Sequence, residues 1–490
     1  MPSPMEISRR NRSGHWRPAL ALFLGLAGHG FAEEPWGERV TLWHATENAH
    51  RYDVYRSNIA YAASPFRITD LRPDDTNAPP FYVYSDKTDF ETRTLTIYRA
   101  HDGARFFRDQ PVVFFVHGGA WVDGYADWYD FVAQSFTGEK GWVTVVVDYR
   151  LTSSNVFLAA DCPDRTNCPP EDRVKAAWYD DNLGDVETAF HWTADHIGAH
   201  GGRTNWIVVM GHSAGAHLST LLLTHTNTAP AATPRAALLV SMSGVYAITN
   251  LGPLLLGFQS EMEQTFHGGI ANVPVLNDAS PARQVSAETG LPPAFILYSQ
   301  PLRDLPGFYL QGEAFHALLQ SLGHDSTNLV LPDIYDHAGE MEAIGRTNET
   351  PTAAIVDFVE TRLRLRDTNA NGVPDWWEWE HFTNLTSVTA NSNHDGDGFS
   401  DLQEFVADTD PASEESHFRV ASISAANECR VACLGSPARV YTLECTPHLG
   451  TGGWSAVAGQ VQVDGTDALF LTDTNRLDGV PAYRVRVQLP

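Results

Sequence analysis

Basic residues are scarce in this chain of 490 residues, which has 33 Lys and Arg against 60 Asp and Glu and a formal net charge of −27. Nucleic-acid binding needs clustered Lys and Arg that attract the phosphate backbone, so this balance argues against a nucleic-acid partner. An acidic surface, or bound cations, fits the composition better.

Long apolar runs are also lacking, because no stretch after residues 19–28 is apolar for long enough to cross a bilayer. That run follows a segment with four arginines and precedes the small residues Gly30 and Ala32. This order is typical of a cleaved secretory signal, with an N-terminal membrane anchor as the alternative. We therefore predict a signal peptide at 1–32, an exported protein (secreted, periplasmic or at the cell surface), and no membrane span after cleavage.

Cysteine is sparse as well, with five residues in the whole chain. Export favours disulfides, and an odd count leaves at least one thiol unpaired within a monomer. Cys162 and Cys168 are close enough in sequence to form a local staple. No cysteine has the histidine spacing of a zinc site, which argues against zinc.

Apolar residues, by contrast, make up 43% of the chain, enough for a sizeable core in a multidomain protein. Short apolar runs predict strands at 111–117, 142–150, 205–211, 236–244, 294–300 and 327–333. Segments with helical periodicity separate them, at 181–199, 213–225 and 308–323. Apolar strands that alternate with helices predict an α/β fold, a mostly parallel sheet with helices on both faces.

The composition changes after Arg366, first to Asp, Asn, Gly and Trp, and from about residue 417 to short alternating strands. We therefore predict an α/β catalytic domain at 33–366, a linker at 367–410, and a small all-β, sandwich-like domain at 411–490. Residues 155–184 are rich in Pro, Asp and Cys, and we expect an insertion there that serves as a lid or specificity wall.

The stretch "IVVMGHSAGAHLSTLLL" (207–223) places a serine between two glycines where an apolar strand gives way to a helix. Gly211 and Gly215 permit a strained turn and close packing, which leaves the Ser213 hydroxyl exposed at a helix N-terminus. Gly-x-Ser-x-Gly alone is a weak pattern. The strand before it and the helix after it predict a nucleophile elbow.

A second glycine-rich turn, "FFVHGGAWVDG" (114–124), also ends an apolar strand. In acyl transfer the carbonyl oxygen becomes an oxyanion, and fixed backbone N–H groups stabilise it without reorganisation. We assign this oxyanion hole to the amides of Gly119, Ala120 and Ala214, and expect His117 to organise the turn. Trp121 is expected to line the acyl pocket and favour small acyl groups, with core packing as the alternative.

Together, "HGGAW", "VDYRL" and "GHSAGAH" resemble α/β-hydrolase esterases of the type that includes bacterial acetyl esterases, feruloyl-esterase-like enzymes and kynurenine formamidases. The resemblance spans roughly residues 90–345. It implies a catalytic triad in the chain order serine, acid, histidine.

Asp304 matches the family's position for the acid, because "ILYSQPLRDLPGFYLQGEAF" follows an apolar strand and precedes a helix. This segment lacks the His-Gly that commonly precedes the acid in esterases, and it is closer to the Asp-x-Pro-x-Phe of formamidase-like members. Asp333 and Asp336 remain alternatives.

His337, in "LVLPDIYDHAGEME", matches the family's position for the base, in a loop after the last core strand. His316 falls inside a predicted helix and His324 before the final strand, so we expect both at the surface. His337 is then predicted to accept the proton of Ser213 while Asp304 orients its imidazole.

Two stretches downstream fit the twelve-residue calcium loop, in which alternate oxygen ligands surround one cation and a glycine makes the central bend. The predicted ligands in "DTNANGVPDWWE" are Asp367, Asn369, Asn371, Val373, Asp375 and Glu378. Those in "NHDGDGFSDLQE" are Asn393, Asp395, Asp397, Phe399, Asp401 and Glu404. Asn393 lowers the charge of the second loop, so we expect that site to be the weaker one.

These loops resemble the dockerin-like and thrombospondin type 3-like calcium repeats of exported bacterial proteins. The resemblance implies structural Ca²⁺ that stiffens the 367–410 junction, with no cofactor needed for catalysis. The alternative is an acidic flexible linker.

The sequence thus predicts an exported serine carboxylesterase that removes acetyl-like groups from a small ester or an acylated carbohydrate through an acyl-enzyme. Two alternatives stay open: a formamidase or amidase of the same fold, and a non-catalytic, calcium-braced binding or adhesion protein. The C-terminal β domain is a candidate for contact with polysaccharide or the cell surface.

Overall fold

The computed structural model describes residues 38–39, 51–62, 93–103, 105–152, 155–157, 173–175, 177–251, 259, 261–263, 265–300, 306–425, 428–447, 453–466, 468–474 and 482–489. The predicted signal peptide, Cys162, Cys168 and Asp304 lie outside these residues.

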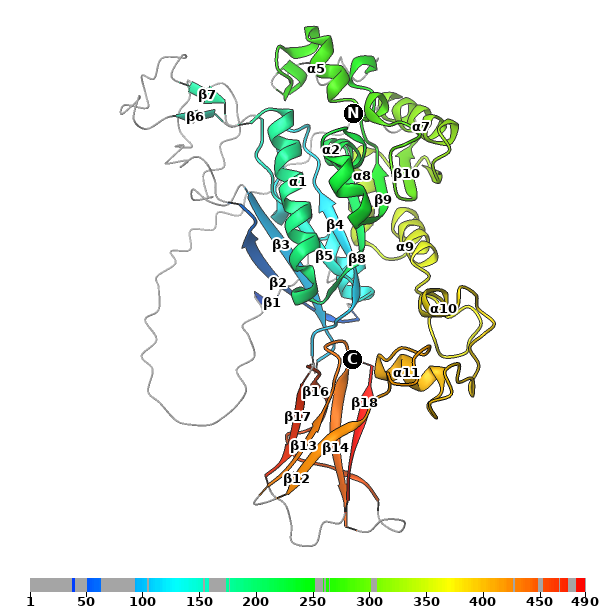
Figure 1. The fold of residues 1–490 in the computed structure, drawn as a ribbon. Coiled ribbons are helices and arrows are strands. Elements are labelled where there is room, and N and C mark those ends of the chain that lie inside the picture. Colours follow the sequence, from blue (N-terminus) through cyan, green and yellow to red (C-terminus); the bar gives the residue numbers. More distant parts are fainter. Residues whose placement is uncertain are drawn as a thin grey trace, which may run out of the picture. The chain divides into compact units, whose positions relative to one another are not determined.

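A nine-stranded sheet forms the central layer of the α/β part (Figure 1). In spatial order its strands are β1 (Glu38–Arg39), β2 (Asp53–Ala60), β3 (Thr94–His101), β5 (Val143–Val147), β4 (Gln110–Val116), β8 (Gly202–His212), β9 (Ala236–Met242), β10 (Ala294–Ser299) and β11 (Ser326–Leu331). Strands β5, β4, β8, β9, β10 and β11 pair in parallel, whereas β1, β2 and β3 pair antiparallel with one another and β3 pairs antiparallel with β5. The predicted mostly parallel sheet is confirmed.

Helices cover both faces of this sheet. They are α1 (Tyr179–His196), α2 (Ala214–Thr224), α3 (Ala229–Ala232), α5 (Val273–Asp278), α6 (Pro281–Gln284), α7 (Pro306–Ser321), α8 (His337–Glu342) and α9 (Thr350–Arg362). Short 3-10 or π turns include Ala126–Tyr129, Gln134–Glu139 and Ala343–Gly345.

Successive side chains of each central strand point to opposite faces, so one strand serves two cores. On β4, Phe114 packs in the core shared with α1, α2 and α7, whereas Phe115 packs in the core shared with α8 and α9. This two-sided burial explains the continuous apolar runs by which the strands were predicted.

All six predicted strands and all three predicted helices of the α/β part are present, with shifts of a few residues at their ends. The prediction did not include β2 and β3. Strand β2 is largely half-buried or exposed and carries polar residues, so it lacks the continuous apolar run of a central strand.

Within the predicted insertion at 155–184, β6 (Asn155–Phe157) and β7 (Arg173–Lys175) form an antiparallel pair. Helix α1 begins at Tyr179, so the end of that predicted segment is helix instead of insertion. A lid function stays a prediction.

Residues after 366 form two smaller groups of elements. Helices α10 (Asp375–Phe382) and α11 (Asp401–Ala407) share an apolar cluster that includes Trp377 and Phe405. Two antiparallel sheets follow, one of β12 (Val420–Ala425), β13 (Cys429–Cys433) and β17 (Leu469–Asp473), the other of β14 (Val440–Thr446), β15 (Ser455–Ala456), β16 (Val463–Asp464) and β18 (Ala482–Gln488).

Residues from both sheets, among them Val431 and Leu443, share one apolar core, as the sandwich-like prediction expected. None of the helices in the described part of the chain has the length and apolar character that a membrane span requires.

Candidate active site

Ser213 stands at the corner between β8 and α2, where the chain changes from strand to helix without a linker. Its backbone adopts φ 57° and ψ −121°, a conformation that costs a non-glycine residue about 1–3 kcal/mol. The Ser213 N–H donates to the Met242 carbonyl on the neighbouring strand β9 at 2.9 Å, which holds the corner in place. This is the geometry of a nucleophile elbow.

The two glycines that flank the elbow are required by space. A Cβ on Gly215 would lie 2.0 Å from the carbonyl oxygen of Val116, and one on Gly211 would lie 2.4 Å from the carbonyl oxygen of Gly215. Any side chain at either position would push α2 away from the sheet. The Gly-x-Ser-x-Gly pattern therefore reflects close helix–strand packing around Ser213.

The turn after β4 lies against the elbow. A Cβ on Gly118 would be 3.1 Å from Cβ of Ser213, and the next two residues have positive φ, 121° at Gly119 and 51° at Ala120. Among the described residues, none accepts a hydrogen bond from the amide of Gly119, Ala120 or Ala214. Backbone N–H groups beside a serine that donate no hydrogen bond to the described residues fit an oxyanion hole, and this assignment stays a prediction.

His117 is fully buried, and its ring stacks between the rings of Tyr149 and Tyr129, at centroid distances of 4.5 and 5.5 Å. Its Nδ1 lies 2.7 Å from the Gly118 carbonyl, and Tyr149 donates to the His117 carbonyl at 3.0 Å. These contacts fit the predicted role in organising the turn.

Trp121 is 3% exposed and belongs to the apolar core, where its ring meets that of Phe266 edge-on. Its Nε1 donates to Nδ1 of His217 at 3.0 Å, and Nε2 of that histidine faces the Ala279 carbonyl at 2.7 Å. Burial lowers the pKa of His217 to about 4, so its neutral ring accepts at one nitrogen and donates at the other. A role of Trp121 in the acyl pocket stays a prediction.

His337 is the first residue of helix α8, so it does not lie in a loop as expected. Its ring stacks on Phe308 of α7 at a centroid distance of 4.1 Å, and it lies 4.5 Å from the ring of His212. His212 immediately precedes Ser213. The structure thus brings the predicted base next to the residue that leads into the predicted nucleophile.

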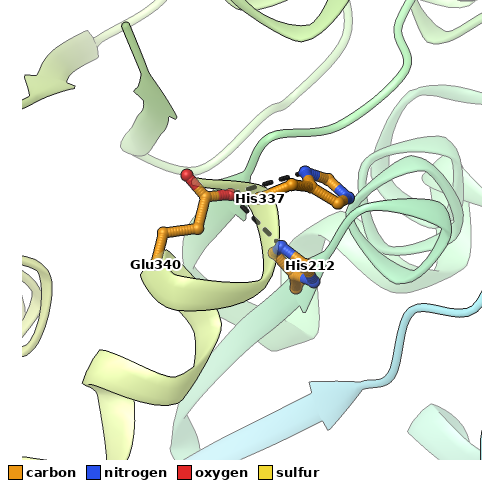
Figure 2. A group of neighbouring side chains, drawn as sticks. All are labelled: His212, His337 and Glu340. Carbon is orange, nitrogen blue, oxygen red and sulfur yellow. Dashed lines mark hydrogen bonds and ion pairs between the residues drawn. The ribbon is translucent and has the colours of Figure 1, made fainter. Parts of the chain in front are cut away.

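Glu340, a fully buried carboxylate on the same helix as His337, was not predicted from the sequence. Its Oε1 lies 3.2 Å from Nε2 of His212 and 3.9 Å from Nδ1 of His337, so both imidazoles face one oxygen (Figure 2). The other oxygen, Oε2, accepts a hydrogen bond from Ser299 at 2.6 Å. The three-residue spacing between His337 and Glu340 was the available signal, because it puts both side chains on one helix face.

The charge of Glu340 is compensated by its neighbours. Burial raises its pKa, but the hydrogen bond and charge of His212, the charge of His337 and a hydrogen bond from Ser243 outweigh burial and lower the pKa below its usual value of 4.5. The carboxylate is therefore ionised at neutral pH and only accepts, so His212 donates to it through Nε2–H.

Asp304 lies outside the described residues, and its role as the acid stays a prediction. The described elements before and after it in sequence are β10, whose last residue Ser299 contacts Glu340, and α7, whose Phe308 stacks on His337. The alternative Asp336 is the N-cap of α8 and accepts from the Gly339 N–H at 2.7 Å, which occupies one of its oxygens.

The two histidines not chosen as base have other partners. His316 lies in α7 with Nδ1 2.8 Å from the Ser326 hydroxyl, and Nε2 of His324 lies 2.8 Å from the Ser286 carbonyl. Neither is among the side chains that meet at Glu340.

In the first predicted calcium loop, the side chains at positions three and five contact the carboxylate at position twelve. Nδ2 of Asn369 lies 3.2 and 3.1 Å from the two carboxylate oxygens of Glu378, and Nδ2 of Asn371 lies 3.1 Å from Oε1. Asp367 accepts from the backbone N–H of Asn371 and Gly372 at 3.1 and 2.8 Å. Burial raises the pKa of Glu378, while the two amides that donate to it oppose the rise.

The same positions meet in the second loop, but all three are carboxylates. Ligand oxygens of Asp395, Asp397 and Glu404 lie within 4.8 Å of one another. Each residue has a buried oxygen that accepts no hydrogen bond among the described residues, and Oδ2 of Asp397 faces Nδ1 of His417 at 3.4 Å. Burial, followed by the charges of the neighbouring aspartates, raises the pKa of Glu404 to about 7.

Position nine begins a helix in both loops, α10 at Asp375 and α11 at Asp401. Asp375 accepts from the Thr368 N–H at 2.8 Å, and Asp401 accepts from the His394 N–H at 3.1 Å. Each of these carboxylates thus accepts a hydrogen bond from the backbone of its own loop. Oxygens that accept no hydrogen bond and repel one another fit a hard cation, so the second loop suits Ca²⁺ by its own donor set.

The remaining predicted ligands shape the two loops. The N–H groups of Val373 and Phe399 donate to the side-chain oxygens of Asn371 and Asp397 at 2.9 and 2.7 Å. Asn393 accepts from the Gly396 N–H at 2.6 Å. Their roles as calcium ligands stay predictions.

Comparison with known proteins locates the similarity in the same part of the chain. Residues 91–251 match the model of the carboxylesterase family. The probable carboxylic ester hydrolase LipM of Mycobacterium tuberculosis is 28% identical over 259 residues, which are 45% of this chain and 54% of that protein. The probable N-octanoylanthranilate hydrolase AqdA2 of Rhodococcus erythropolis is 32% identical over 152 residues, 31% of this chain and 27% of that protein.

This chain therefore spans about half the length of the curated relatives it matches. Among solved structures, a thermostable esterase from Pseudomonas putida is 21% identical, with a TM-score of 0.41 over 56% of this chain and 80% of that one. Residues 91–251 are thus similar to the carboxylesterase family, and they lie on a mostly parallel sheet.

Proposed function

We propose that this protein is a serine carboxylesterase that uses Ser213 as nucleophile, His337 as base and Asp304 as the acid that orients the base. One observation carries the proposal: Ser213 is held in a strained elbow, with the Gly118–Ala120 turn on one side and the His212–His337 pair beside it. The match of residues 91–251 to the carboxylesterase family supports the same reaction class.

In the proposed reaction, Oγ of Ser213 attacks the ester carbonyl carbon and gives its proton to Nε2 of His337. The amides of Gly119, Ala120 and Ala214 receive the oxyanion. The bond to the alcohol then breaks, and His337 returns the proton to the leaving oxygen. Water repeats these steps on the acyl-enzyme, which releases the carboxylic acid and restores Ser213.

We propose small acyl esters as substrates, including acetyl groups on carbohydrate. Trp121 supports a small acyl group, because this bulky residue comes directly after the Gly118–Ala120 turn in the chain. An amide substrate is the second candidate within the same mechanism. It is favoured by the similarity to a relative described as a hydrolase of N-octanoylanthranilate.

We also propose that Ca²⁺ stabilises residues 367–410. Asp395, Asp397 and Glu404 would hold the ion in the second loop, and Asp367, Asn369, Asn371 and Glu378 in the first. The ion would neutralise the acidic side chains and brace the loops. It would take no part in ester hydrolysis.

Export after removal of residues 1–32, and contact of the C-terminal β domain with polysaccharide or the cell surface, complete the proposal. Sequencing the N-terminus of the protein recovered outside the cytoplasm tests the first part. A mature protein that starts near residue 33 is expected, and retention in the cytoplasm would contradict export.

The primary test is pre-steady-state hydrolysis of p-nitrophenyl acetate by the parent protein and by Ser213→Ala. We expect the substitution to lower turnover by at least about 10³-fold, because the nucleophile is lost. Activity that survives in Ser213→Ala would contradict the assignment of the elbow. Inactivity of the parent itself, combined with binding of insoluble polysaccharide, would favour a non-catalytic binding protein.

Substrate class needs its own comparison. Rates on phenyl acetate and N-formylkynurenine distinguish esterase from formamidase, and we expect the ester to be preferred. Trp121→Ala should widen the range of acyl lengths that are accepted. If the range of accepted acyl lengths did not change, Trp121 would only pack in the core.

A further inference from the structure

Glu340 joins three elements of the candidate site. It lies on α8 with His337, it accepts from His212 at the end of β8, and it accepts from Ser299 at the end of β10. A fully buried carboxylate is retained in a protein only when such partners compensate its charge. Its position therefore couples the helix of the predicted base to the strand that leads into the elbow.

The contacts leave Glu340 little freedom to move. Ser299 holds Oε2 at 2.6 Å, and His212 holds Oε1 at 3.2 Å. On the other side of His212, a Cβ on Gly118 would come within 3.3 Å of Nδ1, so this imidazole is also closely packed. Oε1 is thereby fixed 3.9 Å from Nδ1 of His337.

We propose that Glu340 is a positioning residue for His337: it keeps Nδ1 turned towards its carboxylate and Nε2 towards Ser213, and it stabilises the imidazolium that forms during acyl transfer. This inference rests on the proposed esterase function. It adds a second carboxylate to the site, one that acts from the helix of the base itself, whatever the contribution of Asp304.

The two described rings that contact the imidazole of His337 carry no negative charge. Phe308 stacks on the imidazole and is apolar, and His212 is a donor to Glu340. The Asp336 carboxylate caps the backbone of α8 at Gly339. A negative charge 3.9 Å from the ring is close enough to stabilise an imidazolium, because a partly buried pair interacts more strongly than it does in water.

The test compares Glu340→Gln with the parent in the full-length protein. Glutamine keeps the size of the side chain and removes its charge. Glu342→Gln is the matched control, because Glu342 lies exposed on the same helix. Asp304→Asn is measured in parallel. For each variant, kcat and KM on p-nitrophenyl acetate are recorded from pH 4 to 9, together with a thermal melt.

We expect Glu340→Gln to lower kcat by about 10- to 100-fold with KM within about twofold of the parent, as for loss of a charge that acts only in the transition state. The acidic limb of the kcat/KM profile should move to lower pH, because protonated His337 loses its counter-charge. Glu342→Gln should match the parent in both respects. A folded Glu340→Gln variant with the parent's kcat and acidic limb would overturn the proposal.

If Glu340→Gln does not fold, Ser299→Ala tests the proposal instead. This variant removes one hydroxyl donor from Oε2 and leaves the charge in place. Its acidic limb should move slightly to higher pH, because the carboxylate becomes a stronger counter-charge, and an unmoved limb would overturn the proposal. A parent protein without turnover on either esters or amides would contradict the esterase function instead.

Discussion

Glu340 and Glu404 are both buried carboxylates with two further ligand-type side chains close by, yet their pKa values move in opposite directions. Around Glu340 the neighbours are His212 and His337, whose imidazoles compensate the negative charge. Around Glu404 they are Asp395 and Asp397, whose charges repel it. We call these groups the histidine–glutamate cluster and the acidic cluster.

Ligand geometry alone therefore does not identify a metal site. In both clusters the ligand atoms lie within 4.8 Å of one another. The histidine–glutamate cluster is neutralised by its own donors, so it suits proton transfer without an ion. The acidic cluster has no such donors within its three residues, and a cation is the simplest way to balance it.

The largest effect is expected from His337→Ala. We expect kcat on p-nitrophenyl acetate to fall by about 10³- to 10⁶-fold, because this variant removes the proposed base and keeps the fold. Glu404→Gln is the contrasting variant and should keep the parent's kcat in calcium. If Glu404→Gln lost turnover as His337→Ala does, the acidic cluster would have a catalytic role that contradicts the division.

Removal of calcium should affect the acidic cluster. Chelation is expected to lower the free energy of unfolding by about 2.7 kcal/mol, measured from a calcium concentration of about 100 times Kd. Urea unfolding with and without chelator measures this, and protease should then cleave within 367–410. Glu404→Gln should lose most of the response, whereas the exposed control Glu415→Gln should keep it. An unchanged parent curve would contradict structural calcium.

Low pH should reduce the stabilisation that Glu340 of the histidine–glutamate cluster gives the folded protein. The pKa of Glu340 lies below its usual 4.5, so its stabilisation is fully present above that pH and is lost as pH falls through the lower folded value. The stability advantage of the parent over Glu340→Gln should therefore narrow in acid, by on the order of 1 kcal/mol. Urea unfolding at pH 7 and pH 3.5 measures it, and a constant difference would contradict a lowered pKa.

The smallest effect is expected in the first calcium loop. Glu378 is contacted by two asparagine amides, so Glu378→Gln should reduce the chelator response by about 0.5–1.5 kcal/mol, less than Glu404→Gln does. This ranking is the reverse of the sequence-based expectation, which used Asn393 to rank the second loop as weaker. Calcium titration of both variants decides between the two rankings.

Much of the candidate site could be predicted because it depends on local rules. Ser213 follows a strand and opens a helix between two glycines, and both glycines prove to be sites where a side chain has no room. His337 was predicted because its place after the last core strand matches the position of the base in the family that the sequence resembles, and the structure puts it beside His212. These residues are identified by neighbours in sequence, so a single chain reveals them.

Glu340 could not be predicted in the same way. Its proposed role depends on His212 and Ser299, which are distant from it in sequence and reach it only because β8 and β10 end beside α8. Strand β2 was missed because a largely half-buried or exposed strand near the sheet edge lacks a continuous apolar run, whereas β3 is buried but mixes polar with apolar residues.

The α/β alternation, the turn at Ser213, the spacing of the two acidic loops and the β-rich C-terminal part could all be predicted from the sequence, because periodicity and turn chemistry are local properties. Only the tertiary structure decided which buried carboxylate is compensated and which is not. A pKa depends on burial and on charges within a few ångströms, and for Glu340 the fold brings those charges from distant parts of the chain.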